Sequence, residues 1–199
     1  MSGLSVAPYY PWSRVVVSRQ SVSAQGDLAV LDLRPDERFC PLCSRCKQSV
    51  SRTCSHEVRA VRDLNMAGAR VLLRLSYRKV YCRACDAVVV EEMEPVDPYQ
   101  RVTCRLARMI HDLCKEMTVS AVAAYVGLDW KTVKNIDKKL LQEEHGRTDC
   151  QGLRILAIDE VAVRKGQTYM TVVIDYETGR VVWMGMGVRK RLLPSSSPA

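Results

Sequence analysis

Aromatic residues are scarce in this chain: they make up 6% of its 199 residues, and phenylalanine occurs once. A β-sheet that binds RNA by base stacking needs exposed aromatic side chains, so the composition argues against that class of protein. Long apolar runs are also absent, since no stretch approaches the ~20 residues that a membrane helix needs. Residues 1–17 do not combine a basic segment, an apolar block and a cleavage site, so we expect neither a signal peptide nor a membrane partner.

The chain is instead rich in positive charge and cysteine. It has 30 lysines and arginines against 22 acidic residues, a formal net charge of +8, which favours a polyanionic partner such as nucleic acid. A basic protein that is merely soluble is the alternative, and charge alone does not separate the two. The nine cysteines should stay reduced in a cytoplasmic chain, so metal binding is favoured over disulfide bonds.

Four of the cysteines form two C-x-x-C pairs with strand-like sequence between them. Two such pairs can place four thiolates at the corners of a tetrahedron, the geometry that zinc prefers. The predicted ligands of a structural Zn²⁺ are Cys40, Cys43, Cys82 and Cys85. Cys46 adds a third C-x-x-C step, and Cys54 and His56 lie nearby, so these three residues remain rival ligands. Buried thiols without a metal are the alternative.

The first 90 residues carry the patterns of β-strands. Residues 14–33 predict a hairpin, and residues 57–64 and 70–81 predict two strands between the cysteine pairs, which together indicate a zinc ribbon. Three arginines recur with even spacing on the second of these strands and therefore share one face. These candidate phosphate contacts are Arg70, Arg74 and Arg78.

The pattern turns helical after an acidic, proline-containing segment that predicts a linker. Thr118 can cap a short helix that Gly127 ends, and Asp129 can cap a longer basic helix, which is the helix-turn-helix pattern. The N-terminal half of the last helix would turn six side chains toward the major groove of double-stranded DNA. These are Trp130, Lys131, Thr132, Lys134, Asn135 and Lys138. The alternative is a solvated basic face on an ordinary helical hairpin.

Beyond residue 150 the sequence predicts an antiparallel meander of three strands, residues 153–158, 169–174 and 180–183. Such a meander cannot close a core without partners. Asp159 lies where the first strand is expected to end, a favourable place for a metal-binding carboxylate. An ordinary acid at a strand end is the alternative.

Taken in order, several motifs resemble one family of enzymes. The motifs are Cys40-Pro-Leu-Cys43, Arg62-Asp63-Leu64, Tyr81-Cys82-Arg-Ala-Cys85, Gly127-Leu-Asp-Trp-Lys-Thr-Val133 and Ile158-Asp159-Glu160. They resemble the insertion-sequence transposases of the ISL-three family. That resemblance implies a zinc finger, a helix-turn-helix and a C-terminal DDE domain of ribonuclease-H-like fold, with Asp159 as the first acid of the DDE triad.

The resemblance also implies a function. We expect a transposase, or a truncated remnant of one, that binds the terminal inverted repeats of a transposon in double-stranded DNA. Mg²⁺ or Mn²⁺ would serve only a full-length enzyme, because two ions need several carboxylates and the family's second Asp and final Glu are not found here. Asp175 is no substitute, since it starts a turn. We therefore expect a chain that is inactive alone.

Two other functions stay open at this point. A transcription regulator would use the zinc ribbon and the helix-turn-helix but would not need the strand meander. A zinc-ribbon scaffold for protein contacts predicts no salt-dependent DNA binding. For the transposase we expect a prokaryotic, cytoplasmic and nucleoid-associated protein, and a homo-oligomer is compatible with it.

The expected fold is thus a multi-domain α+β chain. A β-hairpin and zinc ribbon come first, a tri-helical helix-turn-helix follows, and the first three strands of a ribonuclease-H-like domain come last. The expected boundaries are 1–39 for the N-terminal hairpin, 40–90 for the zinc ribbon, 91–98 for the linker, 99–146 for the helix-turn-helix, 152–188 for the start of a truncated DDE domain and 189–199 for a disordered tail.

Overall fold

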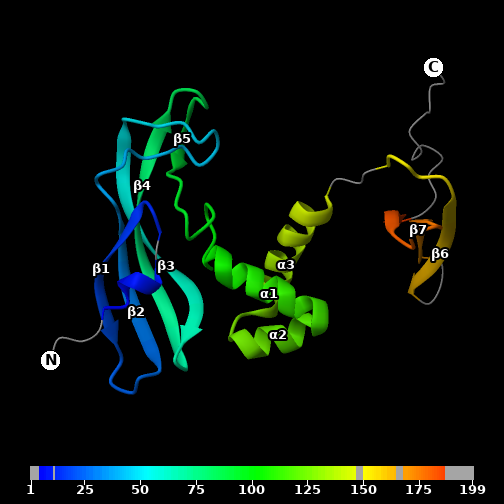
Figure 1. Cartoon of the computed structure of the whole chain (residues 1–199), viewed down its shortest axis with the longest axis horizontal. Helices are drawn as coiled ribbons and strands as arrows, with labels where there is room; N and C mark the ends of the chain where they lie inside the picture. The colour runs from blue at the N-terminus through cyan, green and yellow to red at the C-terminus, as the bar shows by residue number, and fades with distance from the viewer. Residues whose placement is uncertain (1–4, 11, 147–149, 165–167, 187–199) are drawn as a thin grey trace. The chain divides into compact units, whose positions relative to one another are not determined.

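A computed structural model of the chain describes residues 5–10, 12–146, 150–164 and 168–186. It divides into two compact units, residues 1–140 and 141–199. The first unit contains a five-stranded sheet and three α-helices, and the second contains a separate three-stranded sheet (Figure 1). The predicted mixed α+β class is confirmed. None of the described helices is long and apolar enough to cross a membrane.

The large sheet joins two hairpins that the sequence suggested as separate segments. Its strands are β1 (Val15–Val22), β2 (Leu28–Pro35), β3 (Thr53–Met66), β4 (Ala69–Cys82) and β5 (Ala87–Val90). β1 pairs with β2 and β3 pairs with β4, both antiparallel, while β2 runs parallel to β4. The strand order is therefore β1-β2-β4-β3, and the short β5 pairs with the end of β4.

The turn between β3 and β4 explains why this hairpin is long and regular. Ala67 and Gly68 both have positive φ, 49° and 84°. Two successive residues with positive φ match the type I′ turn, whose twist fits that of the flanking strands. β3 and β4 consequently stay paired over most of their length.

β4 contributes to two cores on opposite faces. In its first half the odd-numbered residues Val71, Leu73 and Leu75 are fully buried in the main core. In its second half the even-numbered residues Val80 and Cys82 are buried in a small core that also contains Cys43 and Cys85. Because successive side chains of a strand alternate, the buried face changes between Leu75 and Val80.

The helical part follows the capping residues closely. Its helices are α1 (Cys104–Glu116), α2 (Val119–Val126) and α3 (Trp130–His145). Thr118 accepts a hydrogen bond from the backbone N–H of Ala121, and Gly127 ends α2 in the left-handed conformation with φ 68°. The Asp129 side chain accepts from the backbone N–H of Lys131 at 2.9 Å, as expected for the cap of α3.

The acidic segment before α1 is packed rather than free. Glu91, Met93 and Val96 are 3%, 4% and 1% exposed, and the last two fill the main core. Asp97 forms an ion pair with Lys139 of α3. The apolar residues between the acids anchor this segment, so the predicted linker is instead a strap that touches both the sheet and the helices.

The second unit is the predicted meander. β6 (Leu156–Arg164), β7 (Thr168–Asp175) and β8 (Val181–Met186) pair in the order β6-β7-β8, all antiparallel. Val173 and Val182 are buried, but Ile158 and Met184 are 63% and 56% exposed. Such uncovered apolar strands agree with the expectation that the meander does not close a core alone. The predicted tail, residues 189–199, lies outside the described residues.

Candidate metal centre and nucleic-acid interface

Four cysteine sulfurs lie together at the end of the large sheet. They belong to Cys43, Cys46, Cys82 and Cys85, and all four lie within 4.8 Å of one another. The Sγ atoms of Cys43 and Cys85 are 3.8 Å apart, and those of Cys46 and Cys82 are 3.5 Å apart. Tetrahedral coordination at a Zn–S distance of about 2.3 Å puts the sulfurs about 3.8 Å apart. This donor set therefore fits Zn²⁺.

The structure corrects the predicted ligand set at one position. Cys40 is exposed and lies outside the cluster, where its backbone oxygen accepts a hydrogen bond from Arg14. Cys46 takes its place. Cys54 and His56, the other rivals, are exposed on β3 and are not part of the cluster.

The reason is the shape of the metal-binding turn. In both pairs that form the cluster, the residue after the second cysteine has a positive φ: Lys47 at 61° and Asp86 at 45°. This conformation turns the chain back, and the backbone N–H of Lys47 donates to the oxygen of Cys43 at 2.9 Å. Ser44, which follows the pair of Cys40 and Cys43, does not have it. Glycine favours such a conformation, and neither turn carries one, so the residue types do not indicate which two pairs form the cluster.

The crowded thiols affect each other's protonation. Burial raises the pKa of Cys43, but hydrogen bonds from the backbone N–H groups of Cys46 and Arg45 outweigh it and lower the pKa to about 6. The hydrogen bond with Cys46 and burial raise the pKa of Cys85 to about 12. Like charges this close disfavour one another, so four thiolates need a cation to coexist.

The exposed face of α3 is the main candidate for contact with nucleic acid. Val133 and Ile136 are buried in the helical core, and this orients the rest of the helix. All six side chains predicted to point outward are exposed: Trp130, Lys131, Thr132, Lys134, Asn135 and Lys138. Lysine and asparagine can bind guanine and adenine edges or phosphates.

A buried hydrogen bond fixes α3 against α1. Nδ1 of His111 on α1 and Oδ1 of Asp137 on α3 are 2.7 Å apart, and the His111 side chain is 2% exposed. Sequence analysis did not single out either residue, because a histidine inside an apolar helical stripe gives no indication of its partner. The pair holds the inner side of α3 while the opposite side stays exposed.

Replacing Asp137 by alanine is expected to lower the free energy of unfolding by about 1–3 kcal/mol, because it takes a hydrogen bond from a buried imidazole. Urea unfolding of both proteins would measure the change. Asp112→Ala is the control, since that carboxylate is 63% exposed on α1 and pairs with a lysine that is itself 48% exposed. Equal losses in the two variants would contradict the assignment.

The arginine face of β4 is only partly available. Arg70 is exposed, and Arg74 is 58% exposed with its Nε 3.3 Å from Asp32. The guanidinium of Arg78 is instead bound to the buried carboxylate of Glu91 at 2.7 Å and is 15% exposed. The prediction that Arg78 contacts phosphate is therefore corrected, because β4 has changed its buried face at that point.

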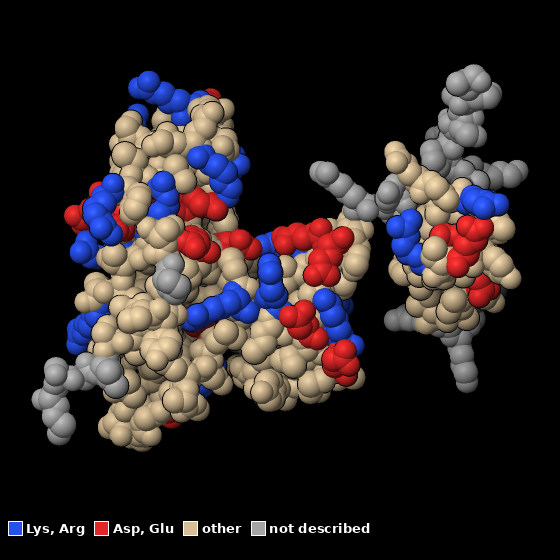
Figure 2. All heavy atoms as spheres, viewed as in Figure 1, with Lys and Arg blue, Asp and Glu red and all other residues tan. Residues whose placement is uncertain are grey.

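One face of the molecule carries no separate patch of positive charge. On the face seen in Figure 2, lysine and arginine side chains are spread over the sheet and the helices and alternate with acidic ones. On this face, contact with nucleic acid would therefore depend on particular residues rather than on a basic patch.

Asp159 lies within a strand rather than at its end. β6 continues to Arg164, Asp159 pairs with Val172, and its carboxylate accepts from the backbone N–H of Glu160. Among the described residues, no second group of three metal-ligating side chains accompanies the cysteine cluster. Asp175 is buried at the end of β7 and accepts from Thr178 in the following turn, as its expected place at a turn implies.

Comparison with known proteins supports the helix-turn-helix part of this fold. A family model described as the helix-turn-helix domain of transposase family ISL3 matches residues 91–141, which include the strap and most of the three helices. A transposase for insertion sequence element IS1001 of Bordetella parapertussis is 37% identical over 146 residues, 73% of this chain. These matches support an ISL3-type insertion-sequence transposase. The resemblance seen in the sequence is thereby confirmed.

A second relative is more distant. A transposase for insertion sequence element IS1557 of Mycobacterium tuberculosis is 25% identical over 177 residues, 86% of this chain. The matched regions are 36% and 39% of the two relatives, so the chain spans less than two fifths of their length. No solved structure matches the chain.

Proposed function

We propose that this chain is the DNA-binding part of an insertion-sequence transposase and binds the terminal inverted repeats of its element. The observation that carries the proposal is the exposed N-terminal half of α3, which presents Lys131, Lys134 and Asn135 within the segment matched by the ISL3 helix-turn-helix model. In such folds this half of the helix enters the major groove. Arg70 and Arg74 on β4 would hold phosphates.

Zn²⁺ has a structural role in this proposal. Cys43, Cys46, Cys82 and Cys85 would hold it, since four thiolates leave no open position for a substrate. The metal would fix the far end of β4, the strand that also carries Arg70 and Arg74. It would thus act on DNA binding only through the fold.

Strand cleavage and joining would belong to a longer chain. Two-metal phosphoryl transfer with Mg²⁺ or Mn²⁺ needs several carboxylates around the ions, and Asp159 is not grouped with others among the described residues. Asp159 would be one of those acids, as the family resemblance implies. We propose that the 199-residue chain alone binds DNA without cutting it, in the cytoplasm of a prokaryote and close to the nucleoid.

If α3 binds DNA, two substitutions on its outer face should have different effects. Lys134→Ala should weaken binding to every duplex and reduce the salt slope by about 1, because it removes a phosphate contact. Asn135→Ala should cost about 1–3 kcal/mol on the terminal repeat and little on unrelated DNA, because it removes a base contact. Fluorescence anisotropy over a series of salt concentrations would measure both.

Lys115→Ala is the matched control, since it removes the same charge from the end of α1 rather than from the outer face of α3. The proposal fails if wild type shows no salt-dependent binding. It also fails if Lys134→Ala and Lys115→Ala have the same small effect, since α3 would then be a solvated face.

A further inference from the structure

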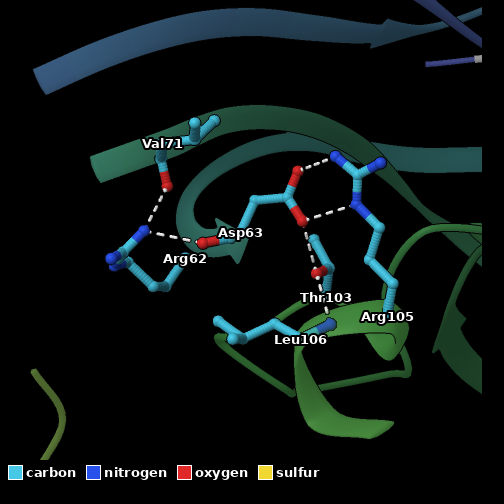
Figure 3. A network of polar contacts seen from close by, with 6 residues as sticks. All are labelled: Arg62, Asp63, Val71, Thr103, Arg105 and Leu106. Carbon is cyan, nitrogen blue, oxygen red and sulfur yellow. Dashed lines mark hydrogen bonds and ion pairs between the residues drawn. The ribbon is translucent and has the colours of Figure 1, made fainter. Parts of the chain in front are cut away.

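The buried carboxylate of Asp63 connects the sheet to the helices (Figure 3). Asp63 lies near the end of β3 and is fully buried. Its Oδ1 accepts hydrogen bonds from Thr103 Oγ1 at 2.7 Å and from Arg105 Nε at 2.8 Å, and its Oδ2 accepts from Arg105 Nη2. One acid of the sheet thus binds two residues at the start of α1.

The contact reaches the first turn of α1 itself. Thr103 is the N-cap of α1, and its hydroxyl oxygen accepts from the backbone N–H of Leu106 at 3.2 Å while its proton goes to Asp63. Figure 3 shows this chain of contacts running from the strand into the helix. Any change in Asp63 therefore alters both the cap and the ion pair.

Arg105 also connects the N-terminal segment to this site. Its guanidinium lies 4.7 Å from the ring centroid of Tyr10 and 5.4 Å from that of Trp12. A cation held over two aromatic faces gains additional attraction, which increases with desolvation. The Arg105 side chain is 36% exposed, so its position is defined by Asp63 on one side and by the two rings on another.

Backbone contacts support the same junction. The backbone N–H of Arg62 donates to the oxygen of Arg101 at 2.8 Å, and the N–H of Thr103 donates to the oxygen of Arg62 at 3.0 Å. Leu64, two residues after Arg62 on β3, packs against the core of the helices. The Arg62 side chain turns the other way and donates to the backbone oxygens of Asp63 and Val71, which holds the hairpin end in place (Figure 3).

We propose that Asp63 and Arg105 are positioning residues for DNA binding, which hold α1, and through it α3, in one orientation on the sheet. A single duplex would then contact the exposed face of α3 and the arginines Arg70 and Arg74 together. This inference rests on the proposed function and adds to it that the two surfaces act as one body. A preorganised pair of surfaces binds more tightly than two that are only tethered, because less freedom is lost on binding.

The test compares two lengths of DNA taken from the end of the insertion element that encodes the chain. One duplex of about one helical turn, ~10 base pairs, offers room for α3, and one of about three turns offers room for both surfaces. For wild type, the affinity for the long duplex should exceed the affinity for the short duplex by more than the added length alone explains. This excess is the gain that the second surface provides. In Arg105→Met, which keeps an unbranched side chain but removes the guanidinium, this gain should fall about tenfold, while affinity for the short duplex stays unchanged.

Two further variants guard against a trivial loss of fold. Arg105→Lys keeps a charge beside Asp63 and should recover part of the gain. Arg108→Met removes one charge from an exposed position of the same helix and should leave the ratio of the two affinities as in wild type. Asp63→Asn should behave like Arg105→Met, since it loses the ion pair but can still accept from Thr103.

The outcomes separate the two proposals. If wild type binds both duplexes but the ratio is the same in Arg105→Met, the positioning role is overturned and DNA binding by α3 stands. If Arg105→Met weakens binding to both duplexes equally, the pair is merely structural and the positioning role is again overturned. If wild type binds neither duplex, the proposed function fails and the positioning role with it.

Discussion

Cys46→Ser is expected to abolish metal binding and to unfold the end of the sheet around β5. The small core there contains few apolar residues, Val50, Val80 and Val89, besides the cysteines. Apolar burial on this scale is small beside the about 10–16 kcal/mol that a structural Zn²⁺ contributes in a small domain. Hydrogen exchange of residues 79–90, together with elemental analysis for zinc, would measure the loss, and a chelator should reproduce it in wild type.

Cys40→Ser is the matched control. It removes a thiol of the same C-x-x-C series, but from an exposed position outside the cluster. We expect this variant to keep one zinc per chain and the protection of wild type. A loss of zinc in Cys40→Ser with retention in Cys46→Ser would show that the metal uses the other pair and would overturn the ligand set.

Glu91→Ala is expected to destabilise the first unit by about 3–5 kcal/mol, because it leaves the guanidinium of Arg78 buried without its partner. Glu91 is 3% exposed, and it accepts from the backbone N–H and from the Nε of Arg78 at 2.6 and 2.8 Å. The same substitution frees one end of the strap. Urea unfolding followed by tryptophan fluorescence would measure it, since Trp12 packs against the main core.

Glu57 offers an internal comparison for Glu91. It forms an ion pair with Lys79, the neighbour of Arg78 on β4, but both side chains of that pair are 41% exposed. Exposed pairs contribute little to stability, so Glu57→Ala should change the unfolding curve only slightly. Similar effects of the two substitutions would contradict the importance of burial at Glu91.

Local patterns carried most of the prediction. The helix-turn-helix followed from capping residues and apolar spacing, and Thr118, Gly127 and Asp129 act as expected because each acts within its own turn. The meander of β6 to β8 followed in the same way from alternating patterns. Such features depend on neighbours in sequence, so a single sequence suffices for them.

Features that depend on contacts between distant parts of the chain could not be predicted from the sequence. The parallel contact of β2 with β4 cannot be deduced from either strand, and it merges the predicted hairpin and ribbon into one sheet. Whether Cys40 or Cys46 joins the cluster depends on the positive φ of Lys47. Lysine does not mark that conformation as a glycine would. Even spacing places Arg78 with Arg70 and Arg74, but its buried partner Glu91 lies thirteen residues later in the chain, so the strand's own sequence does not reveal this ion pair.

The junction at Asp63 was also beyond the sequence. Arg62-Asp63-Leu64 stands out as a motif, yet the partners of Asp63, Thr103 and Arg105, lie about forty residues later in the chain. These three adjacent residues have different partners. Arg62 binds the end of the hairpin, Asp63 binds the start of α1, and Leu64 packs against the helical core. Alternation along a strand puts Asp63 on the face opposite to Arg62 and Leu64, but it does not predict the different partners of the last two.

The parallel pairing of β2 with β4 has a consequence for synthesis on the ribosome. Parallel strands need a long connection, and here it runs through the first metal-binding turn and all of β3 before β4 begins at Ala69. Until β4 has emerged, β2 lacks its inner neighbour, β3 lacks its partner, and Cys43 and Cys46 lack the other half of their cluster. The N-terminal third of the nascent chain therefore stays incomplete until β4, Cys85 and β5 emerge, and these neighbouring segments then complete the sheet and the metal site almost together.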